Sequence, residues 1–151
     1  MKKTKLFIAV LILLFPSMAL PNMPKSAIRE VQKTIEDAYI NGVFLKGDMD
    51  LIKAGWHEEC DIVYFNPESR IVQKGNAINY FEDYFKKKPG PVNEDIAWEF
   101  IDIKIAGNAA LAVVEISNKL KTKKIYTDFL NLYRIQNKEW KIVSKTFFAH
   151  K

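Results

Sequence analysis

Apolar side chains recur every three or four positions in two segments of the chain, which is the spacing of one face of an amphipathic helix. The first segment ends at Gly42, a residue that favours a helix stop. A shorter helix fits between the two segments, because Asp48 can cap its first turn and Gly55 can end it. The predicted helices span residues 27–41, 48–54 and 76–86.

Apolar and polar residues alternate in the second half, which is the period of a half-buried strand. Short turns such as Gly107-Asn108 join consecutive strands, so the later strands predict an antiparallel meander. Helices followed by strands indicate an α+β fold, with the helices packed against one sheet. The predicted strands span residues 61–65, 70–73, 100–105, 109–117, 125–135 and 140–148.

The first 19 residues have the three-part layout of a secretory signal peptide. Three lysines precede an unbroken apolar run over residues 6–15, and a Ser-x-Ala sequence ends at Ala19. A membrane anchor is the alternative, but ten apolar residues fall short of the roughly 20 that cross a bilayer. We therefore expect residues 1–19 to be removed, leaving one domain over residues 20–151 that is secreted or periplasmic without a stable membrane anchor.

Composition excludes several classes of protein. The chain carries 23 basic and 18 acidic residues, a net charge of +5, but three of the lysines belong to the expected signal peptide. The remaining balance of +2 gives little support to nucleic-acid binding. Cys60 is the single cysteine and lies three residues after His57. These two residues alone are too few ligands for a structural metal site. No sequence motif for a cofactor is present, so none is expected.

Asp128 stands out because a carboxylate lies among apolar residues on its face of a predicted strand. Burial of such a group favours either a ligand-binding and proton-transfer role or a structural ion pair. Lys145, on the next predicted strand, is the obvious partner for the ion pair. Both interpretations remain open from the sequence.

His57 follows Trp56 at the junction between a predicted helix and a strand, where a side chain can reach the rim of a cavity. Its ring could instead be satisfied by nearby backbone and by Glu58 or Glu59. If the protein were an enzyme, Asp128 would be its acid or base, and His57 or a tyrosine such as Tyr39 would polarise a substrate oxygen. The side chains of Asp128 and His57 should then face one cavity.

Several short segments of the sequence resemble the nuclear-transport-factor-2-like (NTF2-like) proteins, and more narrowly their SnoaL-like, putative lumazine-binding branch. They are Tyr39-Ile40-Asn41-Gly42, Trp56-His57, the turn over residues 105–110, and the closing hairpin with Tyr126-Thr127-Asp128 and Trp140 to Lys145. Members of this branch often carry a histidine where this chain has Phe148.

The resemblance implies a cone-shaped, cystatin-like fold, in which helices close a strongly curved antiparallel sheet over an apolar pocket, often in a homodimer. We expect the pocket to hold a small, largely apolar or aromatic molecule without catalysis. The alternatives are an isomerase, cyclase or dehydratase, and a dimeric interaction module whose hollow is filled by its own side chains. The expected ligand-binding residues are Tyr39, Trp56, His57, Tyr126, Asp128 and Lys145.

Overall fold

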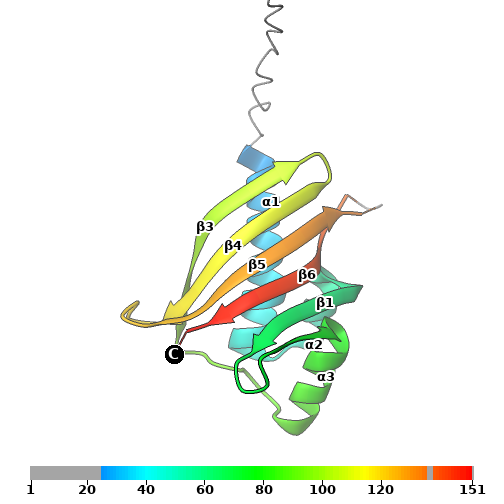
Figure 1. The fold of residues 1–151 in the computed structure, drawn as a ribbon. Coiled ribbons are helices and arrows are strands. Elements are labelled where there is room, and N and C mark those ends of the chain that lie inside the picture. Colours follow the sequence, from blue (N-terminus) through cyan, green and yellow to red (C-terminus); the bar gives the residue numbers. More distant parts are fainter. Residues whose placement is uncertain (1–24, 136–137, 151) are drawn as a thin grey trace, which may run out of the picture.

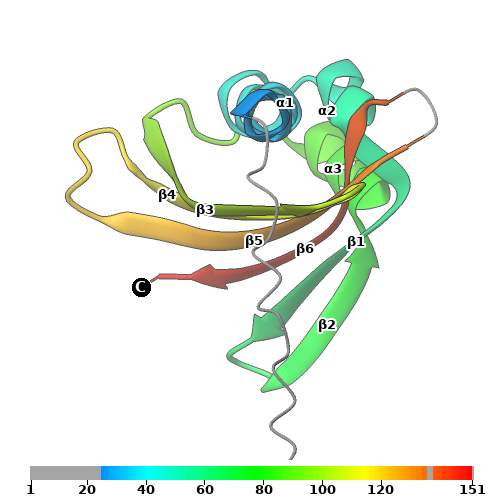
Figure 2. The same cartoon turned by 90° about the horizontal axis from the view of Figure 1, so that it is seen from above.

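Three consecutive helical segments and one further helix lie on one face of a six-stranded sheet (Figures 1 and 2). The computed structural model describes residues 25–135 and 138–150, so the predicted signal peptide lies outside the described residues. The elements are α1 (Lys25–Ile35), η1 (Glu36–Lys46), α2 (Met49–Gly55), β1 (Trp56–Asn66), β2 (Ile71–Asn76), α3 (Ala77–Lys87), β3 (Ile96–Ala106), β4 (Ala109–Asn118), β5 (Lys124–Arg134) and β6 (Trp140–Ala149).

The strands are ordered β2-β1-β6-β5-β4-β3 across the sheet. The predicted meander from β3 to β6 and the hairpin of β1 and β2 are confirmed, and all of these pairings are antiparallel. The expectation of an antiparallel sheet throughout is wrong at one place, because β1 pairs with β6 in parallel and the sheet is therefore mixed. Alternation has period two in either orientation, so the sequence pattern could not distinguish them.

The sheet bends strongly, as the view in Figure 2 shows. Register shifts interrupt four of its pairings, for example between Phe100 and Asp102 on β3. An unpaired extra residue bends a strand and increases its local twist. The resulting curvature lets one sheet wrap around the helices and confirms the expected cone-shaped α+β fold.

The first helix is longer than predicted, because α1 continues without a break into the π-helix η1. Gly42 lies inside η1, and the left-handed residue that ends it is Gly47, with φ of 64°. A Cβ on Gly42 would stand 3.0 Å from Cγ1 of Ile52, so this glycine allows α2 to pack closely on η1. The predicted stop at Gly42 was wrong because the residue serves helix packing instead.

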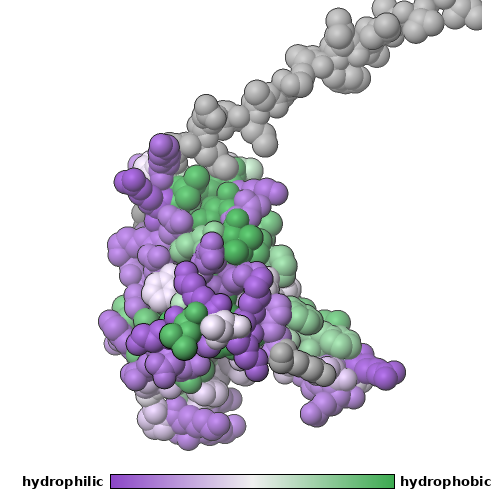
Figure 3. All heavy atoms as spheres, turned by 90° about the vertical axis from the view of Figure 1, so that its left-hand side faces the viewer, coloured by the Kyte–Doolittle hydropathy of each residue, from purple (hydrophilic) through white to green (hydrophobic). Residues whose placement is uncertain are grey.

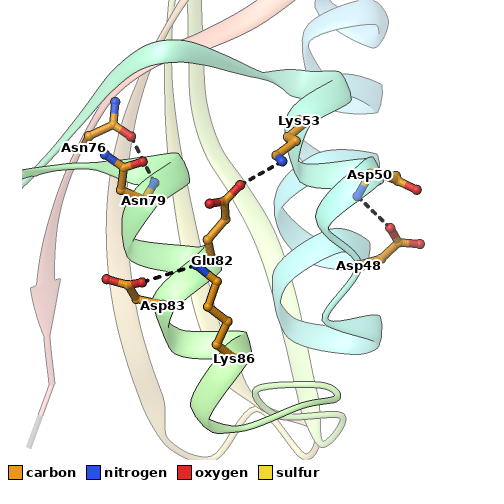
Figure 4. A network of polar contacts seen from close by, with 8 residues as sticks. All are labelled: Asp48, Asp50, Lys53, Asn76, Asn79, Glu82, Asp83 and Lys86. Carbon is orange, nitrogen blue, oxygen red and sulfur yellow. Dashed lines mark hydrogen bonds and ion pairs between the residues drawn. The ribbon is translucent and has the colours of Figure 1, made fainter.

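The two shorter helices begin within one residue of their predicted starts, and each has a side-chain N-cap. The Asp48 side chain accepts hydrogen bonds from the backbone of α2, and Asn76 accepts one from the backbone N–H of Asn79 in α3 (Figure 4). An ion pair of 2.8 Å between Lys53 and Glu82 joins α2 to α3. These contacts hold α3 beside the other helices, over the end of the sheet where β1 lies.

The core lies between the helices and the inner face of the sheet. Alternate residues of β4, Ala110 to Ile116, are buried against it. The surface seen from the side of β3 is mostly polar, with apolar patches between the charged groups (Figure 3). In the described ranges, no helix is both long enough and apolar enough to cross a bilayer.

Candidate functional site

A cavity of about 320 Å³ lies between η1, α3 and the part of the sheet formed by β1, β5 and β6. Eight of the twelve lining residues are aromatic, and Lys145 is the one charged residue among them. The hollow expected from the curved sheet is therefore present, and the side chains of the described residues leave it partly empty. The lining residues are Tyr39, Val43, Phe44, Ile62, Tyr64, Tyr80, Phe81, Tyr84, Val92, Tyr126, Lys145 and Phe147.

The aromatic walls are braced against one another. Phe147 stacks on Tyr64 and meets Tyr126 edge to face, with ring centroids 5.8 Å apart in each pair. Tyr39 packs edge to face on Phe44, with centroids 5.2 Å apart. Such pairs contribute beyond the burial of their area, so the rings that line the space are also held in place by their neighbours.

Three polar side chains meet at the inner wall of this cavity. Asp128 is fully buried, and Lys145 is only 7% exposed. The Lys145 Nζ lies 3.0 Å from Asp128 Oδ1, and Tyr39 Oη donates a hydrogen bond of 2.8 Å to Asp128 Oδ2. Lys145 also donates a hydrogen bond to Tyr39 Oη. Asp128 Oδ2 therefore accepts a hydrogen bond, whereas Oδ1 is held by the charge of Lys145 alone and has no hydrogen-bond partner among the described residues.

Burial shifts the ionisation of this network. It raises the pKa of Tyr39 well above its ordinary 10.0, and the adjacent Asp128 charge reinforces the shift. It lowers the pKa of Lys145 from 10.5, whereas the attraction of Asp128 opposes that change. Tyr39 is therefore a neutral donor near pH 7, and the ion pair is the charged part of the site.

Strand register explains how Asp128 and Lys145 come together. Asp128 on β5 is directly opposite Phe147 on β6, so Lys145, two residues away, is its diagonal neighbour on the same face. The ion pair suggested by the sequence is confirmed. Lys145 lines the cavity, but Asp128 does not, because it lies behind Lys145 and Tyr39.

His57 does not face the cavity, contrary to the geometric expectation. Its Nδ1 accepts a hydrogen bond of 3.1 Å from the backbone N–H of Glu59, the local arrangement that was its alternative. Strand β1 begins at Trp56 rather than at Asp61, so Trp56 points into the core and His57 points to the other face. Trp56 packs edge to face on Tyr39 and Phe81 without lining the cavity.

Cys60 is buried, and its burial raises the pKa of the thiol to about 12. A protonated, enclosed thiol is a poor nucleophile and a poor metal ligand. Within residues 25–135 and 138–150, no three His, Cys, Asp or Glu side chains gather closely enough to hold a metal ion. Phe148 is 61% exposed on the outer face of β6, away from the cavity.

Sequence reasoning did not single out Tyr80, Phe44 and Val92 as cavity residues. Tyr80 and Tyr84 are four residues apart on α3, so a search for a second aromatic stripe on that helix could have found them. Val92 lies in the loop after α3, where its N–H bonds to the carbonyl of Val43, and no periodic pattern marks such a residue.

Known structures share this fold. An NTF2-like protein of unknown function from Shewanella baltica has 18% identity and a TM-score of 0.68, with 86% of this chain and 99% of that chain covered. An NTF2-like protein of unknown function from Methylobacillus flagellatus has 22% identity and a TM-score of 0.68, with 85% and 96% covered. A "putative ketosteroid isomerase" from Parabacteroides distasonis has 18% identity and a TM-score of 0.51, with 87% and 90% covered.

At these identities the similarity shows the fold alone, because one fold carries many activities. No curated protein matches the chain in sequence. The family model described as "Putative lumazine-binding" matches residues 26–148, which include nearly all of the described helices and of the sheet. The chain therefore belongs to the "Putative lumazine-binding" family, and it has the fold of the NTF2-like proteins named above.

Proposed function

We propose that the protein binds a small, planar, largely aromatic molecule in the cavity and does not transform it. The observation that carries this proposal is the cavity wall, in which eight aromatic residues surround one buried lysine. Ligand sites are typically concave and mainly apolar, with a few polar groups that orient the ligand. The family description, which concerns lumazine, points to the same class of flat heterocycle.

The size and polarity of the cavity support a ligand of two or three fused rings. Its volume of about 320 Å³ is at the lower end of the range for small-molecule sites. Tyr64, Tyr80, Tyr84 and Tyr126 form no side-chain hydrogen bond with any residue that the structure describes, so their hydroxyl groups are available to a ligand. Burial raises the pKa of Tyr80 and Tyr126, which keeps these hydroxyls protonated.

Catalysis by Asp128 is the weaker alternative. A general base must reach the proton that it removes, but Tyr39 and Lys145 stand between this carboxylate and the cavity. Its Oδ2 already accepts a hydrogen bond from Tyr39, and its Oδ1 lies in the ion pair with Lys145. The same contacts suit a fixed polar wall against which a ligand rests.

Export and self-association belong to the same proposal. The signal-like segment over residues 1–19 supports export, which cell fractionation and N-terminal sequencing of the mature protein would test. The outer face of the sheet exposes Phe129, Tyr133 and Phe148, which supports a homodimer through that face. Sedimentation analysis of the purified protein would measure its oligomeric state.

The direct test of binding compares two valine-to-tryptophan variants. Val92→Trp places an indole at the cavity, whereas Val72→Trp places it on β2, where Val72 is 64% exposed and outside the cavity. We expect titration with lumazine and related heterocycles to show binding that Val92→Trp weakens about tenfold or more and Val72→Trp leaves within about twofold.

Mass spectrometry of protein purified from its native source provides the second readout, with an aromatic small molecule expected in the bound fraction. The proposal fails if that fraction is empty and no heterocycle binds. It also fails if both tryptophan variants weaken binding equally, because the ligand would then lie elsewhere.

A further inference from the structure

We propose that Lys145 anchors the ligand by donating one hydrogen bond to a neutral acceptor, such as a ring carbonyl, and that the site selects against carboxylates and phosphates. This inference rests on the proposed function and adds the charge state and the anchoring group of the ligand. It follows from counting the donors and charges at the inner wall of the cavity.

The ammonium group of Lys145 has three N–H donors. The Nζ donates one hydrogen bond to Tyr39 Oη, and it lies 3.0 Å from Asp128 Oδ1 in an ion pair without a hydrogen bond. The structure gives the Nζ no other hydrogen-bond partner among the described residues. One donor of the buried lysine is therefore left for a ligand.

The position of the Nζ places this donor among the cavity walls. It lies 4.3 Å from the ring centroid of Tyr39, 4.7 Å from that of Phe147 and 6.0 Å from that of Tyr126. All three rings line the cavity. A flat ligand between these rings would bring its edge to the ammonium group.

The charges at the inner wall already cancel. Asp128 neutralises Lys145, and Tyr39 is neutral because burial and Asp128 raise its pKa. A carboxylate or phosphate at the inner wall would add an uncompensated negative charge beside buried aromatic rings, at a desolvation cost. It would find no cation to balance it among the described lining residues, because Lys145 is the one charged residue there and is already paired with Asp128. A neutral oxygen or nitrogen acceptor matches this charge balance and the free donor of Lys145.

Three matched bicyclic probes test the anchor by calorimetric or NMR titration of the purified protein: tetralin without an acceptor, 1-tetralone with a carbonyl, and tetralin-1-carboxylate. We expect 1-tetralone to bind about tenfold more tightly than tetralin, the size expected for one hydrogen bond from a charged donor. We expect the carboxylate to bind most weakly.

A variant that removes the donor without leaving a buried charge is Lys145→Met combined with Asp128→Asn. Tyr39 can still donate to the amide oxygen of Asn at position 128. We expect this double variant to lose the preference for 1-tetralone over tetralin. The control is Lys104→Met on β3, whose side chain is 74% exposed and outside the cavity; it should retain the preference.

The anchor is refuted if tetralin and 1-tetralone bind equally to the natural protein, or if the double variant retains the preference. Tightest binding of the carboxylate would also refute it. In all of these cases the cavity still binds a bicyclic molecule, so the proposed function stands. If none of the three probes binds and no molecule accompanies the native protein, both proposals fail together.

Discussion

The two ends of the interior are packed in different ways. At one end, α1 lies over the sheet and contributes Val31 and Ile35 to the buried core, which also includes the aliphatic Leu132 and Ile142; all four are fully buried. At the other end, α3 and η1 face β1 and β6 across the aromatic cavity. The same sheet thus supports a filled core at one end and a hollow at the other.

The difference follows from side-chain shape and charge. Branched aliphatic side chains adapt to a curved surface and fill it at close to crystal density. Aromatic rings are rigid plates that pack edge to face, as Tyr39 does on Phe44, and the ion pair of Lys145 and Asp128 cannot be covered by apolar groups without loss. The cavity at this end therefore stays open because its lining residues pack against one another around it and do not fill it.

The largest expected effect comes from the ion pair at the hollow end. Asp128→Ala leaves the Lys145 ammonium buried without its counter-ion, so we expect the free energy of unfolding to fall by about 3–5 kcal/mol. Urea denaturation measures this loss. Adding Lys145→Met to Asp128→Ala should restore part of it, because no charge is then buried. A loss below about 1 kcal/mol in the single variant would contradict the structural role of the pair.

A pair of truncations compares the two ends directly. Leu132→Ala removes a fully buried side chain from the filled end and should cost about 3 kcal/mol. Val92→Ala removes a side chain that already borders the cavity and is 36% exposed, so it should cost less than about 1 kcal/mol. Thermal and urea unfolding of both variants give the values. Equal costs would mean that the cavity end is packed as tightly as the other.

A smaller effect than the loss of the ion pair is the alkaline sensitivity that Cys60 causes. Its pKa rises from 9.0 to about 12 on folding, so the unfolded chain releases this proton first. Stability from this group is fully present below pH 9 and falls by about 1.4 kcal/mol per pH unit between pH 9 and about 12. The lowered pKa of Lys145 acts in the opposite direction as the pH approaches 10.5.

Comparison with Cys60→Ala isolates the contribution of the thiol, because Lys145 is present in both proteins. We expect the natural protein to lose about 1 kcal/mol more than the variant between pH 8 and pH 10, measured by urea unfolding at each pH. Parallel losses in the two proteins would show that the thiol keeps its ordinary pKa when folded.

Much of the fold could be predicted from the sequence because its signals are local. Periodicity gave the three helices, and alternation with short turns gave the meander. The pairing of Asp128 with Lys145 could also be predicted, because opposite charges within apolar stretches of adjacent strands stabilise one another when they pair. The continuation of the helix through Gly42 could not be predicted, because it depends on the close packing of this glycine against Ile52 on α2, a separate element.

The sequence by itself determined the α+β order of elements, the amphipathic faces and the polar pair within an apolar sheet, because each depends on residues near one another along the chain or on adjacent strands. Only the tertiary structure decided which of these residues border the cavity. Tyr39 reaches Asp128 from 89 positions away, and the start of β1 at Trp56 turns His57 outward. Both outcomes depend on how a curved sheet is closed by distant helices, which no local pattern encodes.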